Sequence, residues 1–392
     1  MFRTLSGFFQ HPQSLIVGSG FTSLSLLMGS WATRLPELKI ILDITDGQVG
    51  TALLVLSIGS LIMSPVSSYI MDRFPTGKAT YASVLILAIF YIFPFLAKSY
   101  PFFLLSMFLL GIANGFLNIT INASASIVEK KYQRSIMSSV HGMFSIGAII
   151  GAVSAGIIAG LGISPKIHML GLILFIITAN ILFRKTWFSI PDTDLKSPVF
   201  AIPSVPILGF TAITFCIVLA ELTIMDWSAV YLNDSLSSGS TLAGLGFAGF
   251  SLTMAIGRLS GDTIVPKIGK RNMVVYGCIL SAIGLVIAAY TNLPLVAILG
   301  FTLCGVGMAV IVPLLYSLSA NQKNISPGVG IASIATACVF AGLVGRPLVG
   351  LVSDYAGMAT SIWIAAGFAL TAGMIGMGIR AEAKGQRLEV RA

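Results

Sequence analysis

Charged residues are scarce in this chain. Only 9% of its 392 residues are Asp, Glu, Lys or Arg, whereas 56% are hydrophobic. A soluble domain carries charge on about a quarter of its residues, so the composition excludes a soluble protein and predicts one embedded in a lipid bilayer. Residues 1–13 lack a short apolar core followed by a small-residue cleavage site, so we expect no cleavable signal peptide.

Patterns that carry enzyme chemistry are also lacking. The four cysteines fall in four separate apolar runs without metal-ligand spacing, which predicts inert packing thiols. The chain shows no glycine-rich nucleotide loop, no nucleophile elbow and no cluster of metal ligands. We therefore expect a protein that is not an enzyme and that binds no cofactor and no metal.

Long apolar runs, in contrast, recur along the whole chain. A helix needs roughly 20 apolar residues to cross a bilayer, and twelve runs reach about that length. The predicted spans are 14–35, 47–70, 79–97, 101–127, 135–161, 166–184, 205–232, 241–264, 272–291, 293–320, 328–352 and 358–379. The sequence thus predicts an all-α integral membrane protein with twelve transmembrane helices.

The distribution of basic residues predicts the orientation. If the N-terminus lies in the cytoplasm, most of the 23 Lys and Arg residues fall in cytoplasmic loops, as the positive-inside rule requires. Both termini are then cytoplasmic. This bias also accounts for the net charge of +9, so we expect no nucleic-acid partner.

The twelve spans divide into two similar halves. The polar stretch FRKTWFSIPDTDLKSPVFAIPS separates six spans from six, and its Pro, Asp and Lys content predicts a cytoplasmic linker. Trp31 and Trp227 lie at matching positions near the outer ends of the first and seventh spans. We therefore expect two pseudo-symmetric six-helix bundles, 1–184 and 205–392, joined by residues 185–204, with a binding site between them near the bilayer midplane.

Several motifs resemble those of the major facilitator superfamily. The loop with Asp72, Arg73, Gly77 and Lys78 and the segment GRLSGDTIVPKIGKR are similar to that family's cytoplasmic signature, although Ser68 stands where its leading glycine is usual. More narrowly, GSWATRLPELK, SSVHGMFSIGAIIGA and MDWSAVYL resemble the YbjJ-type bacterial inner-membrane transporters, a branch related to the fucose permeases. The resemblance implies the major facilitator fold, solute transport by alternating access, and a bacterial inner-membrane location.

Ionisable residues within the spans are candidates for proton coupling, because a charge at the bilayer centre costs about 2.5–3.5 kcal/mol on insertion scales. Glu221 lies near the middle of its span, with Asp226 nearer the outside, and both are predicted to carry protons. A structural ion pair with a neighbouring helix is the alternative for each. His141 begins the fifth span and suits a proton relay, or a hydrogen bond at a helix end.

A second group of residues is predicted to act in gating. Arg258 and Asp262 are four residues apart near the cytoplasmic end of the eighth span, where they can pair along the helix or lock onto the other half. The resemblance adds the signature-loop residues Asp72, Arg73, Lys270 and Arg271 to this group.

Solute contacts are predicted on the fourth span. Asn114, Asn118 and Asn122 follow one another at four-residue intervals and so share one helix face. Amides offer donors and acceptors without charge, so Asn114 and Asn118 suit a hydroxyl-rich solute, with helix packing as the alternative. Asn122 is assigned to packing, and the equivalent face of span 10, with Met308, Val312 and Tyr316, has no amides.

Three more residues complete the predicted solute site. Trp31 and Trp227 are placed either in the cavity wall or in the interfacial aromatic belt. Arg346, nearer the outer end of its span, is expected to neutralise Asp226 or bind an anionic solute. Arg34 is expected to reach the headgroups or the cavity.

Together these features predict a proton-coupled symporter for a small polar solute such as a sugar or polyol, acting as a monomer in the inner membrane. A proton-coupled antiporter that exports a hydrophobic or cationic compound is the alternative. A membrane receptor or scaffold is disfavoured, because twelve spans with buried charges carry no appended soluble domain.

Overall fold

The structure is a computed structural model that describes residue 8 and residues 10–133, 136–192, 207–322 and 325–379. The side chains of Ser68, Ser138, Asp262 and Pro327 also lie outside the described part. Within it, every regular element is a helix, and twelve helical segments are long and apolar enough to cross a membrane. The predicted all-α class and the number of spans are confirmed.

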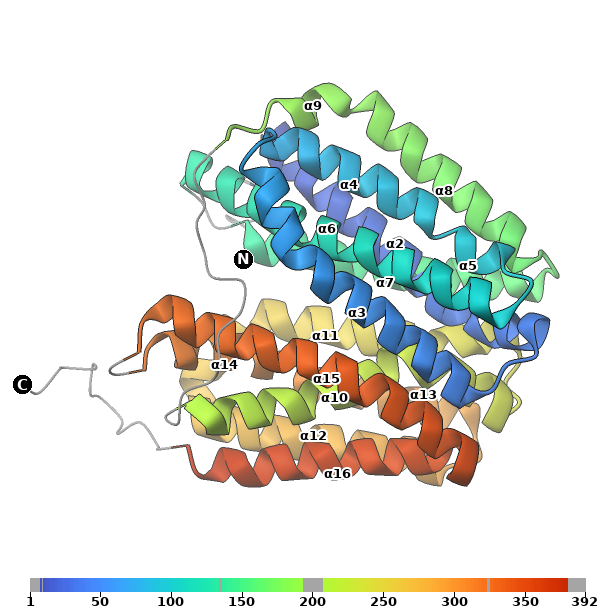
Figure 1. The fold of residues 1–392 in the computed structure, drawn as a ribbon. Helices are drawn as coiled ribbons and strands as arrows, with labels where there is room; N and C mark the ends of the chain where they lie inside the picture. The colour runs from blue at the N-terminus through green and yellow to red at the C-terminus, as the bar shows by residue number, and fades with distance from the viewer. Residues whose placement is uncertain (1–7, 9, 134–135, 193–206, 323–324, 380–392) are drawn as a thin grey trace, which may run out of the picture.

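The first six spans form one bundle (Figure 1). Its helices are α2 (Pro12–Leu42), α3 (Asp46–Met71), α4 (Thr76–Phe90) with the short α5 (Phe93–Leu96), α6 (Tyr100–Tyr132), α7 (Met137–Gly160) and α8 (Pro165–Leu182), and a short α9 (Arg184–Phe188) follows. We call this group the N-terminal bundle.

The last six spans form the C-terminal bundle. Its helices are α10 (Leu208–Val230) continued by the π-helix η2 (Tyr231–Ser235), α11 (Ser240–Ile268), α12 (Lys270–Tyr290), α13 (Pro294–Met308) with α14 (Ile311–Ala320), α15 (Pro327–Ala356) and α16 (Met358–Met377).

Helix ends follow from local sequence. The side chains of Ser164 and Ser326 accept hydrogen bonds from backbone N–H groups in the first turns of α8 and α15, and a proline follows each serine. Gly269 and Gly357 take φ values of 87° and 82°, which only glycine adopts readily, so single residues turn α11 into α12 and α15 into α16.

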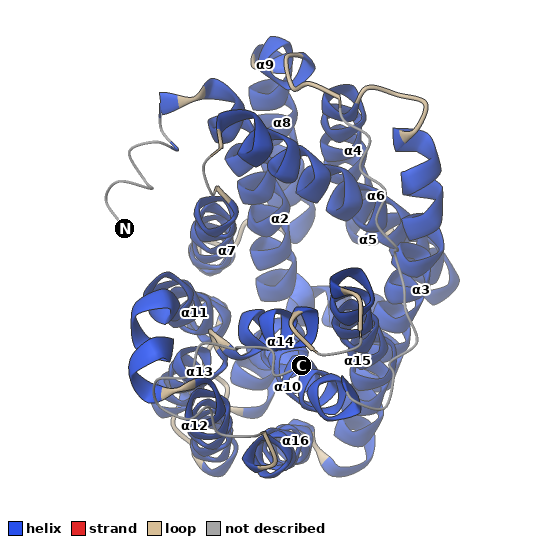
Figure 2. Ribbon diagram, turned by 90° about the vertical axis from the view of Figure 1, so that its left-hand side faces the viewer, coloured by secondary structure: helices blue, strands red, loops and turns tan. Residues whose placement is uncertain are grey.

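The two bundles meet mainly through two helix pairs, and α2 also contacts α10 and α11. Figure 2, viewed along the helices, shows α7 beside α11 on one flank and α3 beside α15 on the other. Glycines allow this close approach: a Cβ on Gly50 of α3 would lie 2.7 Å from the Arg346 carbonyl oxygen, and Gly244 of α11 packs against the Ala152 backbone of α7.

These contacts gather at one end of the molecule, where α2 ends and α3 begins, which we call the closed end. In Figure 1 the bundles separate toward the opposite end, where α2 begins and α12 starts, which we call the open end. The fold therefore holds its two halves in a V-shaped arrangement.

Some helix boundaries, and one helix face in the tenth span, differ from the sequence-based prediction. α2 and α6 run to Leu42 and Tyr132, beyond the predicted spans that end at 35 and 127. The tenth span breaks at residues 309 and 310, between α13 and α14. Met308 is buried while Val312 and Tyr316 line a cavity, so these three residues do not form one continuous face.

The predicted linker, 185–204, is described only as far as residue 192. Its first residues form α9, and Trp187 is fully buried against the N-terminal bundle, where its Nε1–H donates to Asn180 Oδ1 at 3.0 Å. The beginning of this stretch thus packs as part of the bundle, and residues 193–204 lie outside the described part of the chain.

Candidate functional site

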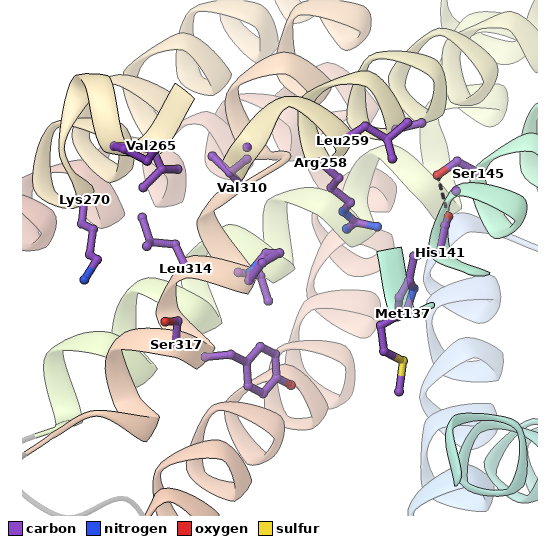
Figure 3. Close-up of a pocket in the computed structure, with 17 residues that line it drawn as sticks. Met137, His141, Ser145, Arg258, Leu259, Val265, Lys270, Val310, Leu314 and Ser317 are labelled. Carbon is purple, nitrogen blue, oxygen red and sulfur yellow. Dashed lines mark hydrogen bonds between the residues drawn. The ribbon is translucent and has the colours of Figure 1, made fainter. Parts of the chain in front are cut away.

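A cavity of about 820 Å³ lies between the bundles toward the open end. α7 forms one wall, and α11, α12 and the α13–α14 segment form the other. Most of its lining is apolar, with Met137, Leu259, Val265 and Leu314 among the contributors. Its cationic or basic lining residues are His141, Arg258 and Lys270 (Figure 3).

Two bundles contribute the ionisable groups at the inner wall of this cavity. Arg258 of α11 and His141 of α7 point toward each other across the space in Figure 3. Arg258 Nη2 lies 3.6 Å from Glu221 Oε1 of α10, and the two side chains are 30% and 17% exposed. The described partner of Arg258 is therefore Glu221. Its predicted pairing with Asp262 involves a side chain that is not described.

A second ion pair lies further toward the closed end. Arg346 Nε donates to Asp226 Oδ2 at 2.8 Å, and Arg346 Nη1 donates to Ser57 Oγ at 2.7 Å. Asp226 is five residues beyond Glu221, or about 7.5 Å along α10. Because Ser57 belongs to α3, this group joins both bundles, and Arg346 does contact Asp226, one of its two predicted partners.

A third layer seals the closed end. Lys39 pairs with Asp46, and its Nζ lies 2.8 Å from Asp234 Oδ2 of η2. The remaining hydrogen bonds of this layer run from Ser353 Oγ to Asp46 Oδ2 at 2.5 Å, and from Thr45 Oγ1 and Gly47 N to Asp354 Oδ2 at 2.7 and 2.9 Å. We call these residues the closed-end network; they link α2 and α3 to η2 and α15.

The amide face of α6 lies between α2 and α3, and neither Asn114 nor Asn118 lines the cavity. Gly115 packs on Ser60 of α3 and Ile121 packs on Gly20 of α2, so Asn118 lies on the face between those two helices. The Asn118 side chain is exposed and Asn114 is half-buried, and neither amide has a hydrogen-bond partner in the described part of the chain. Asn122 instead donates to the Asn118 carbonyl at 2.8 Å.

Neither predicted tryptophan reaches the cavity. Trp31 is 6% exposed and packs on Phe95 and Phe103 of its own bundle, with ring centroids 5.5 and 6.4 Å away. Trp227 is 1% exposed. The predicted place of both residues in the cavity wall is therefore wrong for this conformation. The two tryptophans occupy matching positions in the two halves, but neighbouring helices cover both indole rings.

The predicted gating residues occupy different environments. Lys270 lines the cavity and Arg271 is half-buried at the start of α12. Asp72 and Arg73 are exposed, and the Arg73 guanidinium stacks 4.3 Å over the Tyr69 ring. Within the described residues, no ion pair joins Asp72 or Arg73 to the C-terminal bundle, so the structure does not bring this group together.

Arg34 is a further correction. It is fully buried inside the N-terminal bundle, where it pairs with Glu37 at 2.6 Å and donates to His168 Nδ1 and the Ile163 carbonyl oxygen. Its guanidinium therefore reaches neither the headgroups nor the cavity, because three acceptors within one bundle hold it.

Sequence reasoning missed the closed-end network. Its available signal was the pair of acidic residues that follow spans at the same membrane face, Asp46 in DITDG and Asp354 in VSDYAG. Sequence reasoning also missed Ser57, a small polar residue in an apolar run, because nothing in its spacing indicates the Arg346 contact.

No group of three or more His, Cys, Asp or Glu side chains in the described ranges is placed to hold a metal ion. The arrangement allows its carboxylates and cations to exchange ion-pair partners. Carboxylates and cations are stacked in three layers between the cavity and the closed end. A change of charge in the second or third layer alters contacts that join the two bundles.

Comparison with protein families gives a match along most of the chain. The family model of the Major Facilitator Superfamily matches residues 14–322 and 210–390.

Individual relatives extend over similar lengths. An uncharacterized transporter of Sinorhizobium fredii is 30% identical, with 90% of this chain and 94% of the relative covered. An uncharacterized MFS-type transporter of Yersinia pestis is 28% identical, with 90% and 91% covered. The membrane protein MosC of Rhizobium meliloti is 27% identical, with 86% and 83% covered.

Solved structures show the same fold at low identity. The nucleoside transporter NupG has a TM-score of 0.69 at 15% identity, with 92% of this chain and 98% of that chain covered. A bacterial homologue of the human lysosomal transporter Spinster, inward-facing and unoccupied, has a TM-score of 0.72 at 13% identity, with 93% and 95% covered.

Proposed function

The chain belongs to the major facilitator superfamily, and on that premise we propose that it is a proton-coupled symporter of a small polar solute such as a sugar or polyol. Membership makes it a membrane transporter. The coupling ion, the solute class and the cycle are the parts of the proposal that follow from its side chains.

The observation that carries the proposal is the Glu221–Arg258 pair at the inner wall of the cavity. The two groups lie 3.6 Å apart, and Arg258 lines the cavity, so water in the cavity reaches the guanidinium that pairs with Glu221. A proton that binds Glu221 cancels the attraction to Arg258. Glu221 therefore senses the proton gradient, Asp226 forms a second carboxylate one layer deeper, and His141 relays protons at the cavity surface.

Transport proceeds by alternating access of this site to the two sides of the membrane. We assign the open end to the cytoplasm, because the positive-inside rule places both termini there, and the protein to the bacterial inner membrane. The closed-end network then faces the outside and must break during each cycle. Asp72, Arg73, Asp262 and Arg271 are assigned to the opposite, cytoplasmic gate together with Lys270 and Arg258.

Solute binding is assigned to the amide face of α6. Asn118 and Asn114 hold unused hydrogen-bond donors and acceptors, which suits hydroxyl groups. Both are included in the proposed site, with Arg346 as the group that positions Asp226. Trp31 and Trp227 support the site by packing. We place the protein in the YbjJ-type branch and propose that it works as a monomer, with bundle boundaries at 184 and 205.

The test uses purified protein in proteoliposomes, with solutes first chosen by thermal stabilisation against a panel at pH 6 and pH 8. A ligand at about 100 times its dissociation constant adds roughly 2.7 kcal/mol to stability. With such a solute, Glu221→Gln is expected to abolish accumulation driven by a proton gradient and to retain exchange of internal for external solute.

Glu37→Gln is the matched control, because it makes the same change in another carboxylate that pairs with an arginine but lies away from the cavity. Gradient-driven accumulation that survives in Glu221→Gln removes that residue from the coupling site.

A second function is supported by the apolar lining of the cavity. Val265, Val310 and Leu314 are among its walls, which suits a hydrophobic compound exported in exchange for protons. Stabilisation confined to lipophilic cations or drugs, with no effect of sugars or polyols, would select this antiporter.

A further inference from the structure

The wall of the cavity includes basic side chains. Among its described lining side chains, Arg258, Lys270 and His141 are basic, Tyr316 and the serines carry hydroxyls, and none is a carboxylate. A neutral polyol forms no ion pair with the Arg258 guanidinium in this wall, whereas a solute that carries a negative charge does.

Arg258 is incompletely paired. Its Nε–H is buried and has no hydrogen-bond partner among the described residues, and its Nη2 lies beyond hydrogen-bond distance from Glu221. A guanidinium presents five N–H donors in a planar fork that matches the two oxygens of a carboxylate. The free edge of Arg258 is therefore a ready binding group for one carboxylate.

Resting on the symport proposed above, we infer that the solute is a small hydroxylated monocarboxylate whose carboxylate binds Arg258 once a proton has neutralised Glu221. The Glu221 carboxylate and the solute carboxylate compete for the same guanidinium. Protonation of one is then the condition for binding the other.

The charges balance over a cycle. One proton bonds to a Glu221 carboxylate oxygen, the ion pair with Arg258 ends, and the solute carboxylate takes its place. After the site opens to the other side, the solute leaves, the proton leaves Glu221, and the Glu221–Arg258 pair forms again. One positive and one negative charge cross together, so transport moves no net charge.

The surroundings of Glu221 leave Arg258 as its counter-ion. On α15, Cys338 interacts electrostatically with Glu221, and Tyr316 of α14 lies beside that thiol with its hydroxyl oxygen 4.0 Å from Sγ. His141 faces Arg258 from α7, and Lys270 of α12 lines the same cavity. The helices α13 and α16 carry no Asp, Glu, Lys, Arg or His. The charged residues of α2, which are Arg34, Glu37 and Lys39, lie near the closed end.

The hydroxyl groups of the solute are assigned to Asn118 and Asn114. Asn118 lies about 27 Å along α6 from its first residue, and Arg258 lies about 27 Å along α11, both measured from the closed end. The amide face and the guanidinium are thus at similar depth on opposite bundles. A solute with a carboxylate at one end and hydroxyls along its chain joins the two.

Binding is tested first on purified protein by thermal stabilisation at pH 6 and pH 8. The probes are D-gluconate, D-glucuronate and L-lactate, and their uncharged counterparts are D-glucitol, D-glucose and propane-1,2-diol. We expect stabilisation by at least one carboxylate at tenfold or lower concentration than by its counterpart, and a stronger effect at pH 6. Equal or better stabilisation by the uncharged partner, or none by any carboxylate, overturns the inference.

Two variants separate binding from folding. In Glu221→Gln, which keeps Arg258 permanently unpaired, the carboxylate concentration for half-maximal stabilisation at pH 8 is expected to fall at least tenfold and to lose its dependence on pH. Arg258→Gln is expected to raise the carboxylate concentration for half-maximal stabilisation more than a hundredfold at both pH values. Arg258→Lys should give a value between those of wild type and Arg258→Gln. Glu37→Gln serves as control and changes it less than twofold. If Glu221→Gln binds the carboxylate no better than wild type does, then Glu221 and the solute carboxylate do not compete for Arg258.

Transport in proteoliposomes then distinguishes this inference from the function on which it rests. A potential of about 100 mV shifts accumulation of one net charge about 50-fold. Carboxylate uptake driven by a pH gradient should change less than twofold under that potential. Accumulation of a neutral polyol that responds to the potential contradicts the inference and leaves proton symport intact. Absence of gradient-driven accumulation of both solute types overturns the symport itself.

Discussion

The contacts between the two bundles differ between the closed end and the open end of the molecule. At the closed end, glycines bring α3 against α15 and α7 against α11, and the closed-end network ties loops of both bundles together. At the open end, the same helices diverge around a cavity whose lining is mainly apolar. Polar pairs therefore hold the closed end, which separates in the cycle that we propose, and the open end lacks a matching set of pairs among the described residues.

The largest expected effect comes from the Arg346–Asp226 pair, the middle one of the three layers of charged groups. Asp226→Asn leaves the largely buried Arg346 without its carboxylate, which costs about 3–5 kcal/mol when a buried pair is broken on one side. Thermal unfolding of the purified protein measures this loss. The double variant Asp226→Asn/Arg346→Gln is expected to recover at least half of it.

Asp72→Asn is the control for that comparison, because Asp72 is exposed and a surface substitution changes stability by less than about 0.5 kcal/mol. If Asp226→Asn unfolds at the same temperature as Asp72→Asn, the Arg346–Asp226 pair does not stabilise the protein.

The next effect concerns the glycine contacts. In Gly50→Ala, the new Cβ meets the Arg346 carbonyl at 2.7 Å, and overpacking of this kind costs about 1–3 kcal/mol. The closed end is expected to open, which cross-linking between cysteines placed on α3 and α15 detects as lost yield. Gly367→Ala, whose Cβ has open space, is the matched control and should leave the yield unchanged.

A smaller effect is expected at Lys39. Lys39→Met removes both ion pairs that the ammonium forms, and exposed or partly exposed pairs contribute up to about 1 kcal/mol each. Loss of up to about 2 kcal/mol in total should raise the fraction of molecules open at the closed end by up to about 30-fold. Lys98→Gln, an exposed lysine outside every described ion pair, is the control. The same rise in both variants would attribute the effect to net charge.

The smallest effect concerns the amide face. Asn118→Ala removes one hydrogen-bonding group, worth about 1 kcal/mol, and should weaken solute binding about fivefold without lowering the amount of folded protein. Asn122→Ala is the control, since that amide already donates within α6. An equal loss of binding and of folded protein in Asn118→Ala returns the amide face to a packing role.

Sequence alone predicted the class of fold and the charged residues that lie within the spans better than it predicted the partners of those residues. The number of spans follows from the length of apolar runs, since a bilayer fixes how many residues a helix needs. Glu221, Asp226 and Arg258 stand out because a charge in such a run is costly. Their pairing depends on which helices lie side by side, and that is a property of tertiary packing.

The misplaced residues have a common cause. Trp31 and Arg34 lie near one end of the same span, where sequence suggests a lipid interface or a cavity, yet both are enclosed by helices of the N-terminal bundle. Amphipathicity gives no guidance here, because lipid and protein interior are both apolar. The closed-end network was missed for a related reason: Lys39 and Asp234 are 195 residues apart in the chain and meet only across the two bundles.

The central claim is that protonation of Glu221 lets the two ends exchange roles. It is tested most directly by measuring two distances between spin labels, at the exposed positions Ile41 and Tyr355 of the closed end and Phe74 and Ile268 of the open end. From pH 8 to pH 6, the first distance should increase and the second decrease, and Glu221→Gln should hold the pH 6 distances at both pH values. Distances that do not change with pH, or that change equally in wild type and Glu221→Gln, would contradict the claim.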